Sequence, residues 1–579
     1  MSTAEATLQA REPDARYLAA VQPTLVRQFG LLATALGGVA RLRELILTLA
    51  VQGKLVSQDT GDEPASVLLQ RIIEEQRRLI AEGSIKKERS VSPIDEDEIP
   101  FALPAGWVWT RVGTALPFRI GKTPPSKDSR YWSDSGFSWV SISDMTHFGE
   151  VLETTRKVTQ HGADVFGYEP LPPGTLLMSF KLTIGKIAVL RIPAYHNEAI
   201  ASFLPLGGTN IEFLKYVLPT VSRTGVAKNA LMGQTLNTDS ISDLLIALPP
   251  LPEQARIVAR VDDLMRLCDA LEAQGRLEAE QHARLLGTLL GTLTDSSTPE
   301  ELAANWQRVA DHFDLLLDRP KAVDALEQTI LQLAVRGLLV PQDPSDEPAS
   351  FLLERIRAEK DRLIAEGRIK REKPSTPASE EDPPYTLPDL WAWARVAHLG
   401  ITTTGGTPPS NRPECFGDGT PFIGPGQICP HGAILPAEKF VSKLGCLETS
   451  IAEKGDVMMV CIGGSIGKCA KATEVTAFNQ QINSIRTHFG SGEYVLAAMR
   501  SLDFQHRVIS AATGSATPII SKGKWDLLLL PLPPAAEQTR IVARVTELRH
   551  LCADLRQRLT ASQTTQSHLA EALVEQAAA

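Results

Sequence analysis

The chain has 579 residues and a formal net charge of -9 at pH 7, with 43% hydrophobic and 22% charged residues. This length exceeds what one hydrophobic core usually serves, so several domains are expected. The composition excludes a disordered or fibrous chain, and no apolar run is long enough to span a membrane. Because the first residues also lack the pattern of a secretion signal, we expect a cytoplasmic protein without membrane contact.

The seven cysteines indicate reduced thiols, because their number is odd and no secretion signal accompanies them. Cys429 and His431 are close in sequence, but a tetrahedral zinc site needs two further ligands at suitable spacing, and none is evident. We therefore predict no metal site.

The first predicted element is a pair of helices, and the chain contains this pair twice. The stretch "LTLAVQGKLVSQDTGDEPASVLLQRIIEEQRRLIAEGSIK" (47–86) returns as "LQLAVRGLLVPQDPSDEPASFLLERIRAEKDRLIAEGRIK" (331–370), an offset of 284 positions. Gly53 matches Gly337 at this offset. A repeat of this length indicates a duplicated structural unit.

Charged, Pro-rich linkers follow both helical pairs, at residues 86–100 and 370–384. They are poor in apolar residues, so we expect them to be exposed and mobile and to mark domain edges. A weaker edge lies at 292–305, between the two halves.

After each linker comes a region of short β-like runs separated by Gly and Pro turns, which predicts a compact α/β or mostly β domain. Examples are "SWVSISDM", "GTLLMSF" and "KIAVLRI" in the first region and "DVMMVCI" and "INSIRTH" in the second. The two regions share anchors such as "GKTPPS" and "GGTPPS", but they barely agree between the anchors. The scaffold is repeated while the residues that it displays differ.

A long helix closes each half, opening with "PPLPEQARIVARV" from 249 and "PPAAEQTRIVARV" from 533. Apolar residues step by four and three, which is the heptad pattern of a helix that packs on another helix. Glu253 and Glu537 lie in the first turns, where a carboxylate suits the helix dipole. The apolar positions are Ile257, Val261, Leu264, Cys268 and Leu271 in the first helix and Ile541, Val545, Leu548, Cys552, Leu555 and Leu559 in the second.

This ordered set of motifs, occurring twice from about residue 40 to the end, resembles the specificity (S) subunit of type I restriction-modification systems. The resemblance implies an α+β fold with two α/β-type target-recognition domains, long antiparallel coiled-coil helices between them, and an internal pseudo-two-fold duplication. The implied divisions are 1–102 (helical region and linker), 103–250 (first recognition domain), 251–386 (spacer helix, second helical pair and linker), 387–534 (second recognition domain) and 535–579 (second spacer helix).

The resemblance also implies a function for the assembled complex. Each domain would read one half of a bipartite, asymmetric DNA site, and the helices would bind two methyltransferase (M) subunits while restriction (R) subunits join the complex. Adenine-N6 methylation or DNA cleavage would then belong to the partners. The chain itself would bind no cofactor, whereas the M subunits would use S-adenosylmethionine and the R subunits ATP and Mg.

The net charge of the chain argues against DNA binding, but the charge is unevenly distributed. Residues 104–248 hold 13 Lys and Arg against 11 Asp and Glu, and residues 388–532 hold 12 against 11. The acidity therefore lies outside the candidate recognition domains. Domains this close to neutrality bind phosphates weakly, which suggests that DNA affinity is shared with partner subunits.

Candidate DNA contacts are polar and basic residues in the Gly-Pro loops, in the "IGK" turns and in the amide-rich stretch "FNQQ". Arg can read guanine and Asn can read adenine, while Lys can bind phosphate. Solvated loops, tight turns and loop-fixing buried amides are the structural alternatives. The candidates are Lys122, Ser126, Lys127, Arg130, Tyr131, Lys181, Lys186, Thr407, Ser410, Asn411, Arg412, Ser465, Lys468, Asn479 and Gln480.

Along the spacer helices, the arginines Arg256, Arg260, Arg540 and Arg544 are expected to be free to meet partner subunits. An ordinary coiled-coil dimer is the alternative for these helices. The residues assigned to the spacer and its partners are Glu253, Arg256, Ile257, Val261, Leu264, Glu537, Arg540, Ile541, Val545 and Leu548.

Two motifs resemble functional sites of other proteins, and neither fits its pattern in full. The "IGK" turns lack the spacing of a phosphate-binding P-loop. The tetrad "DPPY" (382–385) matches the amino-methyltransferase motif, but it lies in a polar linker without a preceding apolar strand or a Gly-rich cofactor loop. We predict no catalysis by this chain, and the remaining alternative is a non-DNA interaction scaffold with two protein-binding domains.

Overall fold

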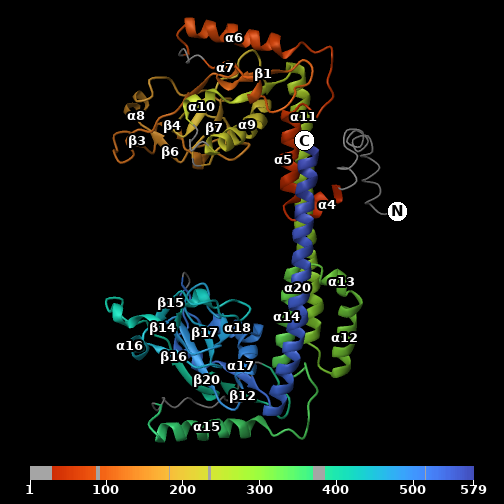
Figure 1. Ribbon diagram of the computed structural model, residues 1–579, viewed down its shortest axis with the longest axis vertical. Helices are drawn as coiled ribbons and strands as arrows, with labels where there is room; N and C mark the ends of the chain where they lie inside the picture. The colour runs from red at the N-terminus through yellow and green to blue at the C-terminus, as the bar shows by residue number, and fades with distance from the viewer. Residues whose placement is uncertain are drawn as a thin grey trace. The chain divides into compact units, whose positions relative to one another are not determined.

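The computed structural model describes residues 29–85, 91–181, 183–231, 237–369, 385–514 and 517–578. The chain forms two compact units (Figure 1). Unit 1 comprises Met1–Leu277 and Gln563–Ala579, and unit 2 comprises Glu278–Ser562. Both unit boundaries fall inside a 44-residue helix, α11 (Leu251–Thr294) or α20 (Ala535–Ala578). Each unit therefore contains a part of both long helices.

Unit 1 begins with helices and continues as an α+β domain. Its helices before α11 are α4 (Phe29–Thr34), α5 (Gly38–Val51), α6 (Ala65–Ala81), α7 (Val112–Ala115), α8 (Gln160–Asp164), α9 (Ile211–Leu231) and α10 (Thr238–Ser242). Its strands are β1 (Val108–Arg111), β2 (Phe118–Ile120), β3 (Trp132–Ser133), β4 (Phe137–Val140), β5 (Gly149–Val151), β6 (Arg156–Val158), β7 (Leu176–Ser179), β8 (Ile187–Leu190), β9 (Ala194–His196), β10 (Ile200–Phe203) and β11 (Leu245–Leu248).

The strands of unit 1 form three sheets, with orders β1-β11, β2-β10-β7-β8-β5 and β3-β6-β4-β9. The β1-β11 ribbon is antiparallel, with Val108 opposite Leu248. It brings the start of the domain beside the strand that leads into α11. The helix α9 packs on β7, β8 and β11 and covers one side of the larger sheet.

Unit 2 follows a similar plan: helices, then an α+β region, then a strand that leads into a long helix. Its helices before α20 are α12 (Pro299–Asp311), α13 (Phe313–Leu316), α14 (Pro320–Val335), α15 (Ala349–Ala365), α16 (Lys443–Leu447), α17 (Gly492–Met499), α18 (Leu502–Ala511) and α19 (Lys522–Asp526). Its strands are β12 (Ala392–Arg395), β13 (Gly400–Thr404), β14 (Phe416–Ile423), β15 (Lys439–Val441), β16 (Ser450–Ala452), β17 (Val457–Val460), β18 (Cys469–Lys471), β19 (Thr476–Phe478), β20 (Ile482–Thr487) and β21 (Leu529–Leu532).

The sheets of unit 2 have orders β12-β21, β13-β20-β17-β18 and β15-β14-β19-β16. In the β12-β21 ribbon Ala392 lies opposite Leu532, the same register as in β1-β11 after the sequence offset of 284. The sheets β3-β6-β4-β9 and β15-β14-β19-β16 each contain a parallel pair, β4-β9 and β14-β19. The strands expected in the five quoted apolar runs are present as β4, β7, β8, β17 and β20.

The loop that links the two helices of each pair needs glycine at one position. Gly53 has φ 69° and Gly337 has φ 73°, which L side chains rarely adopt. An added Cβ would also lie 2.5 Å from the Cγ of Pro104 or Pro388. This close approach explains why the glycine is present in both copies.

The apolar heptad residues at the start of α11 are buried in the core of unit 1, and those at the start of α20 are buried in the core of unit 2. Ile257, Val261 and Cys268 are fully buried with α5 and with Ala570 and Ala577 from the end of α20. In unit 2 the corresponding residues of α20 are buried with α14 and with the last part of α11. The predicted helix-on-helix packing is therefore present within each unit.

The first linker differs from the prediction over its second half. Residues 91–100 are mostly exposed, yet Arg111 anchors them by donating to the carbonyl oxygens of Ser92 (2.9 Å) and Pro93 (2.8 Å). The Arg111 guanidinium also lies 2.5 Å from Glu98. A buried arginine needs several acceptors, and this exposed part of the linker supplies them, so it is attached to the domain by hydrogen bonds that the sequence did not predict. Residues 86–90 and 370–384 lie outside the described residues.

Within the described ranges, no helix is long and apolar enough to cross a membrane. The same residues hold no cluster of three or more His, Cys, Asp or Glu side chains suited to a metal ion.

Candidate nucleic-acid interface

The "GKTPPS" loop of unit 1 places its basic residues at the surface, but several already have partners. Lys122 Nζ donates to the carbonyl oxygens of Val165 (2.8 Å) and Phe166 (3.3 Å). Arg130 is 73% exposed and forms an ion pair with Asp128 at 2.7 Å. Ser126 and Lys127 are exposed, and the Tyr131 ring lies 4.6 Å from that of His161.

The corresponding loop of unit 2 has the same character. Thr407 donates to Gln480 Oε1 at 2.6 Å. Arg412 forms ion pairs with Glu414 (3.1 Å) and Glu448 (2.8 Å). Ser410 and Asn411 are exposed. Lys122, Arg130 and Arg412 therefore have internal partners that DNA would have to replace, and DNA contact by these loops stays a prediction.

Both "IGK" turns are tight turns between strands. Gly185 has φ 77° and Gly467 has φ 88°. Lys186 is half-buried, and its Nζ donates to the carbonyl oxygen of Ile142 at 2.9 Å. Lys468 and Ser465 are half-buried, whereas Lys181 is exposed beside the ring of Phe180. Gly185 and Gly467 thus allow the backbone conformation that each turn requires.

The amide-rich stretches are fixed inside their own loops. Asn197 Oδ1 accepts from the backbone N–H of Ala199 at 3.0 Å. Asn479 Oδ1 accepts from the backbone N–H of Gln481, and its Nδ2 donates to the side chain of Gln481, both at 3.1 Å. The loop-fixing interpretation therefore describes Asn479, while Gln480 is exposed. Next to Asn197, burial lowers the pKa of His196 to about 4, so this histidine is neutral at pH 7.

Two arginines that the sequence did not single out lie over aromatic rings of unit 1. The Arg156 guanidinium carbon is 3.5 Å from the centre of the Trp132 ring, and that of Arg119 is 4.1 Å from the Tyr168 ring. Both arginines are half-buried. Sequence spacing gave no signal for this stacking, because Arg156 and Trp132 meet only through the β3-β6 pairing.

A buried carboxylate joins three segments at the start of each long helix. Glu253 is 1% exposed and accepts from Trp107 Nε1 (3.0 Å) and from Gln58 Nε2 (2.8 Å). We call these three residues the first clasp. Burial raises the pKa of Glu253, and the hydrogen bonds from Trp107 and Gln58 oppose that rise.

The same arrangement is present in unit 2. Glu537 is 1% exposed and accepts from Trp391 Nε1 (2.9 Å) and from Gln342 Nε2 (2.7 Å), and these residues form the second clasp. Sequence reasoning placed both glutamates in a first helical turn but missed their partners. The signal that could have found them is the repetition of the Gln, Trp and Glu positions at one offset.

The expectation that the helix arginines are free to meet partners needs correction. Arg256 forms an ion pair with Asp62 at 2.7 Å, and Arg540 forms the matching pair with Asp346 at 2.6 Å. Arg544 pairs with Glu547 on its own helix at 2.6 Å, and Arg260 also has an interaction. Arg256 and Arg540 thus link the start of each long helix to the loop of the helical pair.

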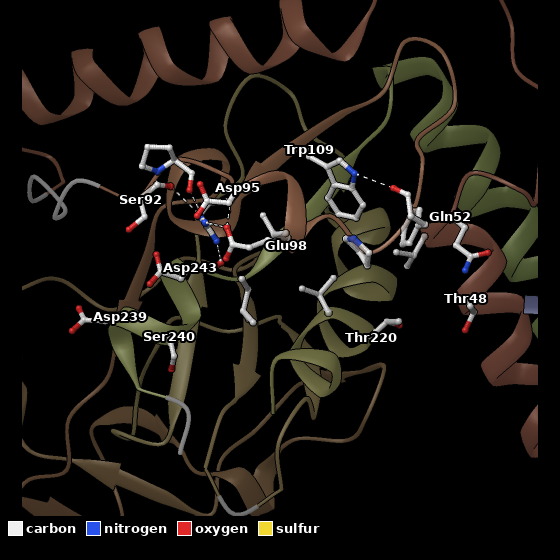
Figure 2. Close-up of a pocket in the computed structure, with 18 of the residues that line it drawn as sticks. Thr48, Gln52, Ser92, Asp95, Glu98, Trp109, Thr220, Asp239, Ser240 and Asp243 are labelled. Atoms are coloured by element: carbon white, nitrogen blue, oxygen red, sulfur yellow. Dashed lines mark hydrogen bonds and ion pairs between the residues drawn. The ribbon is translucent and has the colours of Figure 1, made fainter. Parts of the chain in front are cut away.

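A cavity of about 820 Å³ lies where α5, β1 and α10 of unit 1 meet the anchored linker (Figure 2). Figure 2 shows Asp95, Glu98, Asp239 and Asp243 around it. Carboxylates repel the DNA backbone, and the nearby Arg111 is occupied by the linker and by the Asp243 carbonyl oxygen at 2.7 Å. The acidic lining of this cavity therefore disfavours contact with a DNA backbone.

The tyrosine of "DPPY" is a packing residue. Tyr385 donates from its hydroxyl to the carbonyl oxygen of Val335 at 3.1 Å, and its ring packs edge-on against Trp393. Asp382, Pro383 and Pro384 lie outside the described residues.

The two α+β units, each containing a part of both long helices, display different loops on a similar scaffold. A family model described as the type I restriction modification DNA specificity domain matches residues 104–281. The type I restriction enzyme EcoAI specificity subunit of Escherichia coli is 34% identical, with 93% of this chain and 94% of that protein covered. The EcoEI specificity subunit of the same species is also 34% identical, again covering 93% and 94%.

Among solved structures, a chain from a study of complex assembly and conformational transition of the type I R-M system aligns with a TM-score of 0.47 and 18% identity. The alignment covers 83% of this chain and 99% of the solved chain. On the two relatives aligned over nearly their whole length, this chain belongs to the family of type I restriction enzyme specificity subunits. Its role is DNA recognition in a type I restriction-modification system.

Proposed function

We propose that the chain reads a bipartite, asymmetric DNA site, with residues 103–250 recognising one half-site and residues 387–534 the other. The observation that carries this proposal is that the buried contacts of the two halves are repeated while the loop side chains of the two domains differ. The two clasps have the same partners at the same sequence offset, whereas the loops of the two domains present different side chains. One scaffold holding two different surfaces is what an asymmetric site requires.

We further propose that the two halves form an internal pseudo-two-fold duplication with antiparallel long helices. Unit 1 holds the first part of α11 and the last part of α20, while unit 2 holds the other parts. Such an exchange of ends is expected when two helices of equal length run in opposite directions. Helix length then sets the number of base pairs between the half-sites.

In this proposal the chain is not catalytic and acts in the cytoplasm with partner subunits. Two methyltransferase subunits supply adenine-N6 methylation with S-adenosylmethionine, and restriction subunits supply cleavage with ATP and Mg. The near-neutral recognition domains favour such sharing, because DNA affinity needs more phosphate contacts than they offer alone.

Mapping methylated adenines across the genome, with and without this gene, tests the proposal. We expect one split motif to lose methylation when the gene is removed and to regain it on complementation. Purified chain with S-adenosylmethionine alone should transfer no methyl group. If no split motif is lost and the chain shows no sequence preference for duplex DNA, the scaffold alternative replaces this one.

A further inference from the structure

The strands β6 and β15 occupy equivalent positions in the two recognition domains. The residue after each strand makes matching hydrogen bonds: Thr159 N–H donates to the carbonyl of Tyr131 (3.1 Å), and Ser442 N–H donates to that of Cys415 (3.0 Å). Both side chains then cap a short helix, accepting from Gly162 N–H and Gly445 N–H. Counting back three residues makes Arg156 the counterpart of Lys439.

The Arg156 guanidinium lies over the rings of two tryptophans. Its guanidinium carbon lies 3.5 Å from the Trp132 ring centre and 5.7 Å from that of Trp139. Trp139 is 4% exposed, and its Nε1 donates to the carbonyl oxygen of Lys122 at 3.0 Å. A guanidinium packed by its face keeps its edge N–H groups available to a planar acceptor.

No carboxylate neutralises either cation in the part of the chain that the structure describes. Arg130 and Arg191 of the same domain are paired with Asp128 and Glu150 at 2.7 and 2.6 Å. Neither Arg156 nor Lys439 forms an ion pair with a described residue, and Lys439 is exposed. Binding a DNA acceptor would therefore break no internal ion pair at these two positions.

We propose that Arg156 reads a guanine of the first half-site through its edge N–H groups, and that Lys439 occupies the matching contact in the second half-site. Arg binds guanine O6 and N7 with two parallel hydrogen bonds, whereas Lys acts as a point charge. The same strand position would therefore contact DNA differently in the two domains, through a guanidinium at Arg156 and through an ammonium group at Lys439. This inference rests on the proposed function, because it assigns a contact within each half-site.

The test uses the complex of the full chain with its methyltransferase subunits and measures methyl transfer to duplexes randomised in one half-site at a time. We expect R156A to reduce discrimination at one G·C pair of the first half-site by about 5- to 150-fold, the effect of one bidentate contact. The variant R156K keeps the positive charge but loses the two parallel N–H donors of arginine. It should therefore also reduce discrimination at that G·C pair. The second half-site should stay unchanged in both variants.

The matched controls are R191A, which removes another arginine of the same domain, and K439A, which should affect only the second half-site. Uniform weakening across all sequences, with a smaller salt dependence, would show a phosphate contact and overturn the guanine assignment. Unchanged specificity in R156A and R156K would overturn the contact itself. If the native complex methylates no split motif, the proposed function fails instead, so the two failures are distinguishable.

Discussion

At the scale of single residues, Glu253 is the acceptor on which three segments converge: the helical pair through Gln58, the recognition domain through Trp107, and α11 itself. The donors come from positions 195 and 146 residues away in sequence. Helical pattern and dipole predict a carboxylate in the first turn, but they do not predict these tertiary contacts. The arginines show the same limit, since the sequence pattern does not predict the ion pair between Arg256 and Asp62.

We predict that E253A opens the first clasp while the second stays closed. The buried Trp107 and the exposed Gln58 lose their common acceptor, which costs about 2 kcal/mol, or roughly 30-fold faster amide exchange where local opening governs exchange. Hydrogen exchange measured by mass spectrometry should show this around residues 52–64 and 104–111. Variant E537A should show the same change around residues 336–348 and 388–395 only, so each variant is the control for the other. Equal exchange in native and variant chains would refute this role.

At the scale of helices, the ion pairs between each helical pair and its long helix have opposite polarity in the two units. Arg43 on α5 lies 2.7 Å from Asp269 and 3.0 Å from Glu272 on α11. Position 327 on α14, equivalent to 43 at the offset of 284, is a glutamate that accepts from Arg549 (2.7 Å) and Arg556 (2.8 Å) on α20.

This inversion disfavours pairing a helix with the wrong copy. If α5 packed on the α20 segment of unit 2, Arg43 would meet Arg556, and α14 on α11 would bring Glu327 to Glu272. Like charges at helix interfaces oppose such pairings. A duplicated chain with nearly identical apolar stripes needs such a distinction, because the apolar contacts alone do not separate the copies. The repeat and its heptads were predictable from sequence, whereas this inversion required knowing which side chains meet.

We predict that R43E lowers the free energy of unfolding by about 0.5 to 1 kcal/mol, since these pairs are partly exposed. The triple variant R43E/D269A/E272R gives unit 1 the polarity of unit 2 at positions 43, 269 and 272 and should restore most of the loss. Urea unfolding of the full chain measures both, with R43K as the control that keeps the charge. A triple variant no more stable than R43E would show that these charges do not interact.

At the scale of the molecule, the repeat indicated two similar halves, and the family resemblance named their function. The sequence pattern did not indicate that each unit contains the C-terminal part of the long helix of the other half. Heptad spacing identifies which face of a helix is buried, but it does not identify the partner. In unit 1 the end of α20 packs on α4 and α5, with an ion pair between Arg41 and Glu571 at 2.8 Å.

The exchanged ends lead to a prediction about the spacing of the DNA site. Adding four residues to α11 near Leu271, together with four to α20 near Leu555, lengthens both helices by about 6 Å, which is roughly two base pairs of DNA. We expect genome-wide methylation mapping to show a longer nonspecific gap between two unchanged half-sites. Four residues added to the linker at 370–384 should leave the gap as it is. Altered half-sites in the lengthened chain would show that the helices also shape base recognition, and an unaltered gap would show that they do not set the spacing.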